Sequence, residues 1–228
     1  MQERVVVSVG GSLIVPDEID AAFLSAFKAL VLEKIERGFS FAVIAGGGKT
    51  ARRYQEAARG VANLSASDLD WLGIHATRLN GHLLRTVLEE VAYPVMITNP
   101  DEVQDAPKEA RVIVAAGYRP GASTDLRAVE IAKHLGATRL VNLSNIDYAY
   151  TADPKQDPNA QKIEKISWAD FRKLIPHEWD PGLSAPFDPV AAREAESLGL
   201  EVAIMNGAHL ERLTSYLDGE PFIGTIIA

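Results

Sequence analysis

The sequence predicts an α/β protein, a three-layer αβα sandwich built around a mainly parallel central sheet. Short apolar runs alternate with longer amphipathic segments along most of the 228 residues. The apolar runs are hydrophobic at nearly every position, which is typical of strands covered by helices on both faces. The order strand–helix–strand also recurs along the chain, and this order favours parallel strands joined by crossover helices.

Six apolar runs are the expected strands and six amphipathic segments are the expected helices. The expected strands are Val5–Val9, Phe39–Ala45, Val95–Thr98, Val112–Ala116, Arg139–Leu143 and Val202–Asn206. The expected helices are Ala21–Arg37, Lys49–Gly60, Ser67–Val91, Asp125–Leu135, Asp188–Leu198 and His209–Leu217. Asp20 is placed to cap the first helix and Gly38 to end it.

Hydrophobic residues make up 47% of the chain, enough to bury the core of one domain. We expect a single domain of residues 1–228 with two tightly joined lobes. A polar connection at Pro100–Lys108 marks their border, which gives an N-terminal lobe of about residues 1–108 and a C-terminal lobe of about 109–228. The proline-rich segment Ile175–Pro189 is expected to form a surface loop near the functional site.

Composition narrows the partners and the compartment. The net charge of −8 argues against a general nucleic-acid-binding protein, and the absence of cysteine excludes disulfides and thiolate chemistry. The N-terminus leads straight into a strand without a signal peptide, and no apolar run approaches the length of about 18 residues that a membrane span needs. We therefore expect a cytoplasmic protein with neither a nucleic-acid nor a membrane partner.

The strongest functional signal is the run Gly46-Gly47-Gly48-Lys49-Thr50-Ala51-Arg52, between an apolar run and a helix. Glycines let backbone amides approach a phosphate, and the start of a helix favours an anion. The spacing fits neither a Walker nor a dinucleotide-binding pattern, and a tight strand-to-helix turn is the plain alternative. A second junction, Gly10-Gly11-Ser12, follows the first strand. Two such junctions predict that two phosphate-bearing ligands meet between them.

Two more loops follow expected strands, where parallel sheets bind their ligands. One is Tyr118–Asp125, in which Ser123 or Thr124 is placed to cap the next helix. The other holds Asn145 and Tyr150-Thr151-Ala152-Asp153-Pro154, which is also a sequence typical of a plain turn. The five histidines show no spacing typical of metal ligands, so no protein metal site is predicted.

Together these motifs resemble the amino-acid-kinase superfamily and, within it, the archaeal-type uridylate (UMP) kinases. The matching pieces span nearly the whole chain. They are Val9–Leu13, Gly46–Arg52, Asp70–Ile74, Thr77–Asn80, Pro120–Asp125, Tyr150–Lys155 and Asp188–Ala192.

The resemblance implies transfer of a phosphoryl group from ATP to UMP with Mg²⁺, in a homo-oligomer that is a hexamer in the family. The N-terminal lobe would hold the acceptor and the C-terminal lobe the donor. The implied UMP contacts are Gly47, Asp70, Tyr118, Arg119, Pro120, Gly121, Ala122, Ser123 and Thr124, with Asp70 on the ribose hydroxyls. The implied ATP contacts are Gly11, Ser12, Gly48, Arg52, Ser144, Asn145, Tyr150 and Asp153. Asp125, Arg52 and Lys49 are the implied catalytic residues.

The chain also departs from the superfamily pattern. Ser8 stands where many members carry a lysine, and Ala185-Pro186-Phe187 occupies the region of a second lysine. Arg119 and Lys155 are candidates to supply the missing positive charge. These departures leave two alternatives to a UMP kinase: another small-molecule kinase of the superfamily, and a non-catalytic nucleotide-binding or storage protein with the same fold.

Overall fold

A computed structural model describes residues 3–178 and 185–228 of the chain. A seven-stranded sheet forms its centre, in the order β3-β2-β1-β4-β8-β9-β7. The strands are β1 (Glu3–Val9), β2 (Phe39–Ala45), β3 (Val112–Ala115), β4 (Arg139–Ser144), β7 (Lys165–Ile166), β8 (Glu201–Asn206) and β9 (Thr225–Ile227). The five from β3 to β8 are parallel, and β9 runs antiparallel to β8.

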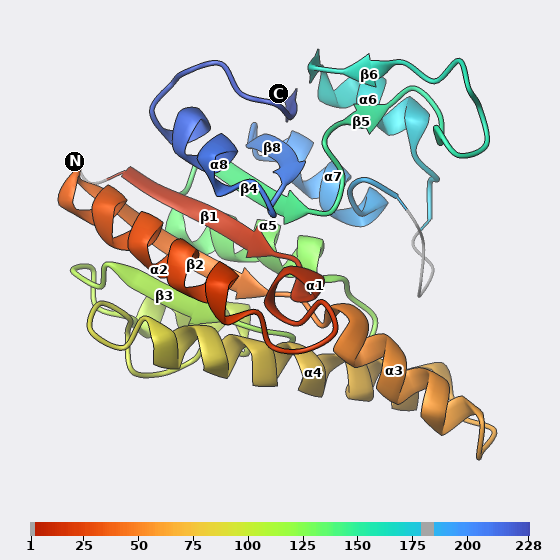
Figure 1. The fold of residues 1–228 in the computed structure, drawn as a ribbon, viewed down its shortest axis with the longest axis horizontal. Coiled ribbons are helices and arrows are strands. Elements are labelled where there is room, and N and C mark those ends of the chain that lie inside the picture. Colours follow the sequence, from red (N-terminus) through yellow and green to blue (C-terminus); the bar gives the residue numbers. More distant parts are fainter. Residues whose placement is uncertain (1–2, 179–184) are drawn as a thin grey trace.

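Helices cover both faces of this sheet (Figure 1). The helices α2 (Ala21–Glu36), α4 (Ala66–Val87) and α8 (Leu210–Leu217) pack on one apolar cluster. On the other face lie α5 (Thr124–Leu135), α6 (Trp168–Leu174), α7 (Pro189–Ser197) and the 3₁₀ helix η1 (Pro100–Asp105). Valine side chains of β1 alternate between the two clusters, because successive residues of a strand face opposite sides. The predicted αβα sandwich is confirmed.

The chain reverses its order of strand addition at the centre of the sheet. From β1 it continues outward to β2 and β3, and it then returns to add β4 and β8 on the other side of β1. Ligands of open parallel sheets bind at the carboxyl ends of the strands at such a switch point. Two helices begin at this end, α1 (Gly11–Ile14) after β1 and α3 (Gly48–Arg59) after β2, and both follow glycines (Figure 1).

Most expected elements are present, with shifts of a few residues at their ends. Asp20 caps α2 through the amide of Phe23, as predicted. The expected strand Val95–Thr98 is wrong, because this segment makes only an isolated parallel bridge between Ile97 and Ala115. Ala92 also forms an isolated bridge with Val112, and Pro94 between the two bridges has no N–H to donate, so no continuous ladder forms.

Several short elements have no counterpart in the expectations. They are the helices α1 and α6, the strands β7 and β9, and a small hairpin of β5 (Ala149–Tyr150) and β6 (Lys162–Ile163). Strands of two or three residues are too short to show a periodicity in the sequence. One continuous sheet joins the two expected lobes, since β3 pairs with β2. Residues 179–184 of the expected loop at 175–189 lie outside the described residues.

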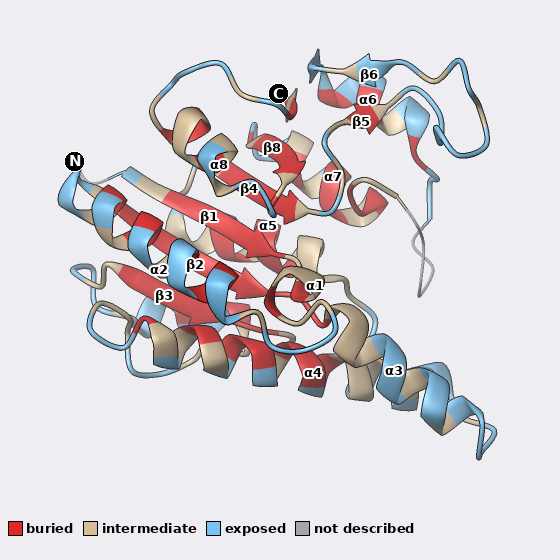
Figure 2. Cartoon of the chain, in the orientation of Figure 1, coloured by how far each residue is buried: buried red, intermediate tan, exposed pale blue. Residues whose placement is uncertain are grey.

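Helix α3 and the start of α4 project beyond the sheet (Figure 1), and α3 has no buried residue (Figure 2). Only the first turn of α3 therefore contributes to the centre of the molecule. Its N-terminus rests on the glycines that follow β1, whereas its last turns reach into solvent.

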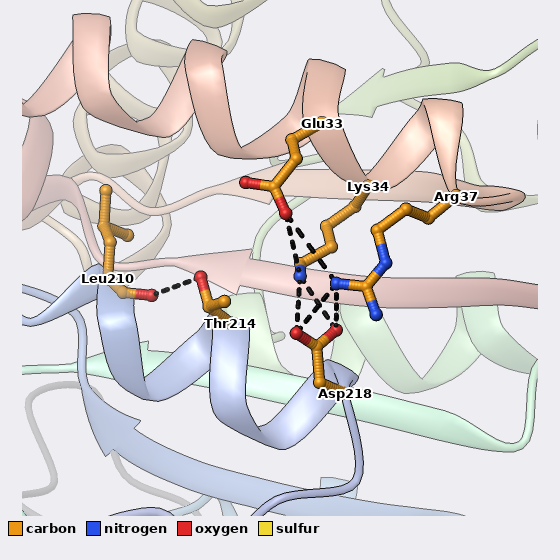
Figure 3. A network of polar contacts seen from close by, with 6 residues as sticks. All are labelled: Glu33, Lys34, Arg37, Leu210, Thr214 and Asp218. Carbon is orange, nitrogen blue, oxygen red and sulfur yellow. Dashed lines mark hydrogen bonds and ion pairs between the residues drawn. The ribbon is translucent and has the colours of Figure 1, made fainter.

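A buried ion pair joins α2 to the end of α8 (Figure 3). The side chain of Lys34 is fully buried, and its Nζ lies 2.8 Å from Oδ1 of Asp218. Arg37 also reaches this carboxylate, at 2.8 Å. Hydrogen bonds from Lys34 and Arg37 lower the pKa of Asp218, so the carboxylate stays charged opposite the buried ammonium.

Candidate active site

The two glycine junctions are in direct contact at the carboxyl ends of β1 and β2. A Cβ atom on Gly11 would lie 2.4 Å from the carbonyl oxygen of Gly46, and one on Gly48 would lie 2.3 Å from the carbonyl carbon of Gly11. Gly48 also has a φ of +57°. Only glycine fits these positions, so the backbones of the two loops pack against each other with no side chain between them.

Ser12 connects the first glycine loop to helix α3. Its Oγ accepts hydrogen bonds from the amide of Lys49 at 3.2 Å and from the guanidinium of Arg52 at 3.1 Å. The side chain of Lys49 points elsewhere, because its ammonium is 3.2 Å from Asp17, which also pairs with Arg53. Within the described residues Arg52 has no carboxylate partner. Of the two predicted catalytic cations, Lys49 is therefore paired with Asp17, whereas Arg52 is not.

Asp125 sits in the first turn of α5, beside the strand ends. Its carboxylate accepts hydrogen bonds from the side-chain amide of Asn142 at 3.3 Å and from the backbone amide of Asp188 at 3.1 Å. Burial, helped by the nearby Asp188 carboxylate, raises the pKa of Asp125 to about 7, although the hydrogen bond from the amide of Asp188 acts in the opposite direction. Ser8 is buried and pairs with Asn142 in the sheet register, so a polar patch lies under Asp125.

A cavity of about 220 Å³ opens between α3, α4 and the loop that follows β3. Its wall includes eight of the nine predicted UMP contacts, which are Gly47, Asp70, Tyr118, Arg119, Pro120, Ala122, Ser123 and Thr124. The ninth, Gly121, donates its amide to Asp70 at 2.9 Å. Gly48 and Arg52, predicted to contact ATP, line the same cavity. Three arginines and one carboxylate face this space, which suits an anion.

Helix α4 holds the loop of this cavity in place. Arg78 donates to the carbonyl oxygens of Gly117 and Tyr118 at 3.0 and 2.9 Å. Thr77 accepts from the amide of Gly117 at 2.8 Å. One turn further, Asn80 donates to the carbonyl of Gly46 at 2.8 Å and so supports the triglycine loop. These contacts fix two loops from one helix.

A second cavity, of about 460 Å³, lies beyond the end of β4. All four residues predicted to bind the ATP nucleoside line it, namely Ser144, Asn145, Tyr150 and Asp153. Lys155 lines it too, as do Ala185 and Pro186, while Phe187 is fully buried in the core. The amide of Gly10 donates to the carbonyl of Leu143 at 2.9 Å, which ties the first glycine loop to the strand that leads into this cavity.

Comparisons with known proteins identify the family of the chain. The sequence model of the "Amino acid kinase family" matches residues 3–206. The chain belongs to the amino acid kinase family. It is 35% identical to the "Uridylate kinase" of Methanocorpusculum labreanum over 98% of this chain and 95% of that protein. It is also 35% identical to the "Uridylate kinase" of Pyrococcus abyssi, over 95% and 96% of the two chains.

Solved structures of amino acid kinases share the fold. The uridylate kinase of Archaeoglobus fulgidus superposes with a TM-score of 0.84 at 30% identity, covering 98% of this chain and 99% of that one. An aspartate kinase from Synechocystis superposes with a TM-score of 0.75 at 18% identity and therefore shows the fold alone. None of the helices in the described residues combines the length and apolar character needed to cross a bilayer.

Several residues of the candidate site in this amino acid kinase were not predicted from the sequence. Thr77, Arg78 and Asn80 belong to a matched motif, but no role was predicted for them. The spacing of Asp70, Gly73 and Thr77 is a usable signal, because residues three, four and seven apart share a helix face. Arg127 was not predicted at all, and it lines the smaller cavity. A helical arginine gives no such signal in sequence.

Proposed function

We propose that this amino acid kinase is a UMP kinase that transfers the γ-phosphoryl group of ATP to UMP, giving UDP and ADP. One observation carries the proposal: a continuous backbone path connects two cavities through the glycine junctions. It runs from Gly47 and Gly48 in the smaller cavity to Gly11, and from Gly10 to Leu143 beside the larger cavity. Two nucleotides bound on either side would bring their phosphates together over the glycines.

In this proposal UMP occupies the smaller cavity. Its phosphate faces Gly47, and it also faces Gly48 and Arg52, which the resemblance assigns to ATP but which line this cavity. Backbone amides and a guanidinium favour an anion there. Asp70 accepts hydrogen bonds from the ribose hydroxyls while one of its oxygens is fixed by Gly121. The loop from Tyr118 to Thr124 encloses the remainder of the acceptor.

ATP occupies the larger cavity, with its nucleoside against Asn145 and Tyr150 and its phosphates directed toward Gly11 and Ser12. A phosphate oxygen of UMP forms a bond to the γ-phosphorus as the bond to the β-γ bridging oxygen breaks, and ADP leaves. The nucleophile is already an anion, so no strong general base is needed. The protein contributes alignment and compensation of charge, with Arg52 as the main cation.

Mg²⁺ would supply positive charge to the phosphates of ATP when it is bound. Residues 3–178 and 185–228 contain no group of three or more His, Cys, Asp or Glu side chains that is placed to hold a metal ion. Kinases usually hold Mg²⁺ through substrate phosphates, water and few carboxylates. The carboxylates and histidines of the described residues therefore fit a metal ion that arrives with ATP rather than one held by a cage of protein ligands.

A UMP kinase serves pyrimidine nucleotide biosynthesis, and we place this one in the cytoplasm as a homo-oligomer, a hexamer by resemblance to its family. The acceptor would bind between the two lobes, with Gly47 and Asp70 from the N-terminal lobe and the loop from Tyr118 to Thr124 from the C-terminal lobe, and the ATP nucleoside would bind in the C-terminal lobe.

A coupled assay that detects ADP tests the reaction. ATP and Mg²⁺ are supplied with UMP, CMP, acetylglutamate, aspartate or carbamate as acceptor. Turnover of UMP above the other acceptors is expected. Turnover of another acceptor alone would assign the protein to a different kinase of the family. Tight binding of ATP and UMP by calorimetry, without turnover of any acceptor, would instead indicate a non-catalytic nucleotide-binding protein.

A further inference from the structure

Helix α5 presents two functional faces at its start. Asp125 turns toward β4, where it bonds to Asn142. Thr124 and Arg127 are three residues apart, so they lie on one side of the helix, and both line the acceptor cavity. The catalytic carboxylate and the cavity wall thus come from opposite sides of the same helical turn.

Arg127 is a buried cation whose hydrogen bonds are incomplete. The residue is only 7% exposed, and its Nη1 pairs with Glu130 on the next turn. Its Nε is buried without a hydrogen-bond partner in the described residues. The guanidinium lies 5.8 Å from the ring centroid of Tyr118, which holds it at the cavity wall. This Nε is enclosed by protein atoms, so a ligand in the cavity would meet the Nη atoms of the guanidinium, which still have N–H groups to donate.

The acceptor nucleotide offers oxygens at two ends. Its phosphate end is assigned to Gly47, Gly48 and Arg52, and the carboxylate of Asp70 would repel a phosphate on its own side of the cavity. Arg127 instead contacts Tyr118 of the enclosing loop. The oxygens left for Arg127 are those of the base carbonyls.

We propose that Arg127 recognises the uracil base by donating a hydrogen bond to its 4-carbonyl, and so selects UMP over CMP. This inference rests on the proposed function. A guanidinium only donates hydrogen bonds, and cytosine carries a donating amino group where uracil carries the 4-carbonyl. Because Arg127 is buried, a donor facing it would leave both groups unpaired, which is a strong basis for discrimination.

The test is a cycle of two substrates and two proteins. The substrates are UMP and the ribonucleotide of pyrimidin-2-one, which lacks only the 4-substituent. We expect the unmodified enzyme to prefer UMP by about tenfold or more in kcat/KM, and Arg127→Met to lower this preference to less than about threefold. Arg193→Met is the matched control, because Arg193 lines a neighbouring cavity but not this one. It should keep the full preference.

A second variant of Arg127 and a third substrate, CMP, keep the test decisive. Arg127→Gln offers an amide that accepts as well as donates, so kcat/KM for CMP should rise relative to UMP by about tenfold. The KM for ATP should stay within about twofold in both variants. Equal losses for UMP and the pyrimidin-2-one nucleotide, or an unmodified enzyme that does not distinguish them, would overturn the role of Arg127. An unmodified enzyme that does not phosphorylate UMP would overturn the proposed function instead.

Discussion

Gly11 and Gly48 lie so close together that neither leaves room for a methyl group. A Cβ on Gly11 would be 2.5 Å from the amide nitrogen of Gly48, and a Cβ on Gly48 would be 2.8 Å from the Cα of Gly11. Backbone amides can approach two phosphate chains only where no side chain intervenes. The contact between these two glycines therefore sets the geometry of the whole site.

Gly48→Ala tests this contact. Both the clash and the positive φ oppose alanine, so we expect a loss of about 3 kcal/mol in the free energy of unfolding beyond the backbone strain, and loss of measurable turnover. Gly136→Ala is the matched control. Gly136 has a φ of +62°, but a methyl group there would meet no atom within 4 Å, so this variant should lose only about 1–2 kcal/mol and keep its kcat. Equal effects of both variants in urea melts and ADP assays would contradict the close-contact argument.

Arg52 and Lys49 should differ sharply in their contribution to turnover. Arg52→Met removes a cation with no carboxylate partner in the described residues, so kcat should fall by about 100-fold or more. Lys49→Met removes a cation already paired with Asp17, so kcat should fall by less than about tenfold. Steady-state kinetics with saturating ATP and UMP measures both. A larger loss for Lys49→Met would show that Lys49 leaves Asp17 when the nucleotides bind.

The raised pKa of Asp125 predicts a pH-dependent stability of the nucleotide-free protein. Its pKa is about 7 in the folded chain, against 3.8 for an ordinary aspartate. Between these values the folded state keeps a proton that the unfolded state has released. Stability from this group is therefore fully present below about pH 4 and is lost as the pH rises toward 7.

Asp125→Asn isolates that effect, because asparagine stays neutral at every pH. The difference in free energy of unfolding between the unmodified protein and the variant should change by a few kcal/mol between pH 4 and pH 8. The unmodified protein should become less stable relative to the variant as the pH rises. Urea titrations at a series of pH values give this difference. A constant difference would mean that the carboxylate is charged throughout.

The buried pair of Lys34 and Asp218 should respond asymmetrically to substitution. Asp218→Ala leaves a fully buried ammonium without its main partner and should cost about 3 kcal/mol in the free energy of unfolding. Combining it with Lys34→Met removes the buried charge and should restore most of that loss. Arg37→Met is the control on the same carboxylate, and as an exposed residue it should hardly move the urea midpoint. A double variant no more stable than Asp218→Ala would show that packing, not charge, dominates there.

The sequence alone determined the central architecture and the place of the site. The strands β1, β2, β4 and β8 are nearly continuous apolar runs, so their burial can be predicted from local sequence, and glycines mark the loops where we propose that phosphates approach. The segment at Val95–Thr98 has the same apolar character but only bridges to β3, since strand pairing depends on a partner far along the chain.

Only the tertiary structure decided which charges are available at the site. Lys49 and Arg52 lie on the same turn of α3, yet Asp17 neutralises Lys49 and does not pair with Arg52. Arg127 looks like an ordinary helical arginine in sequence, and it becomes part of the wall of the smaller cavity because α5 packs beside the loop of Tyr118. Hydrophobic periodicity is a local property of the chain, whereas the pairing and burial of a charge depend on residues that folding brings together.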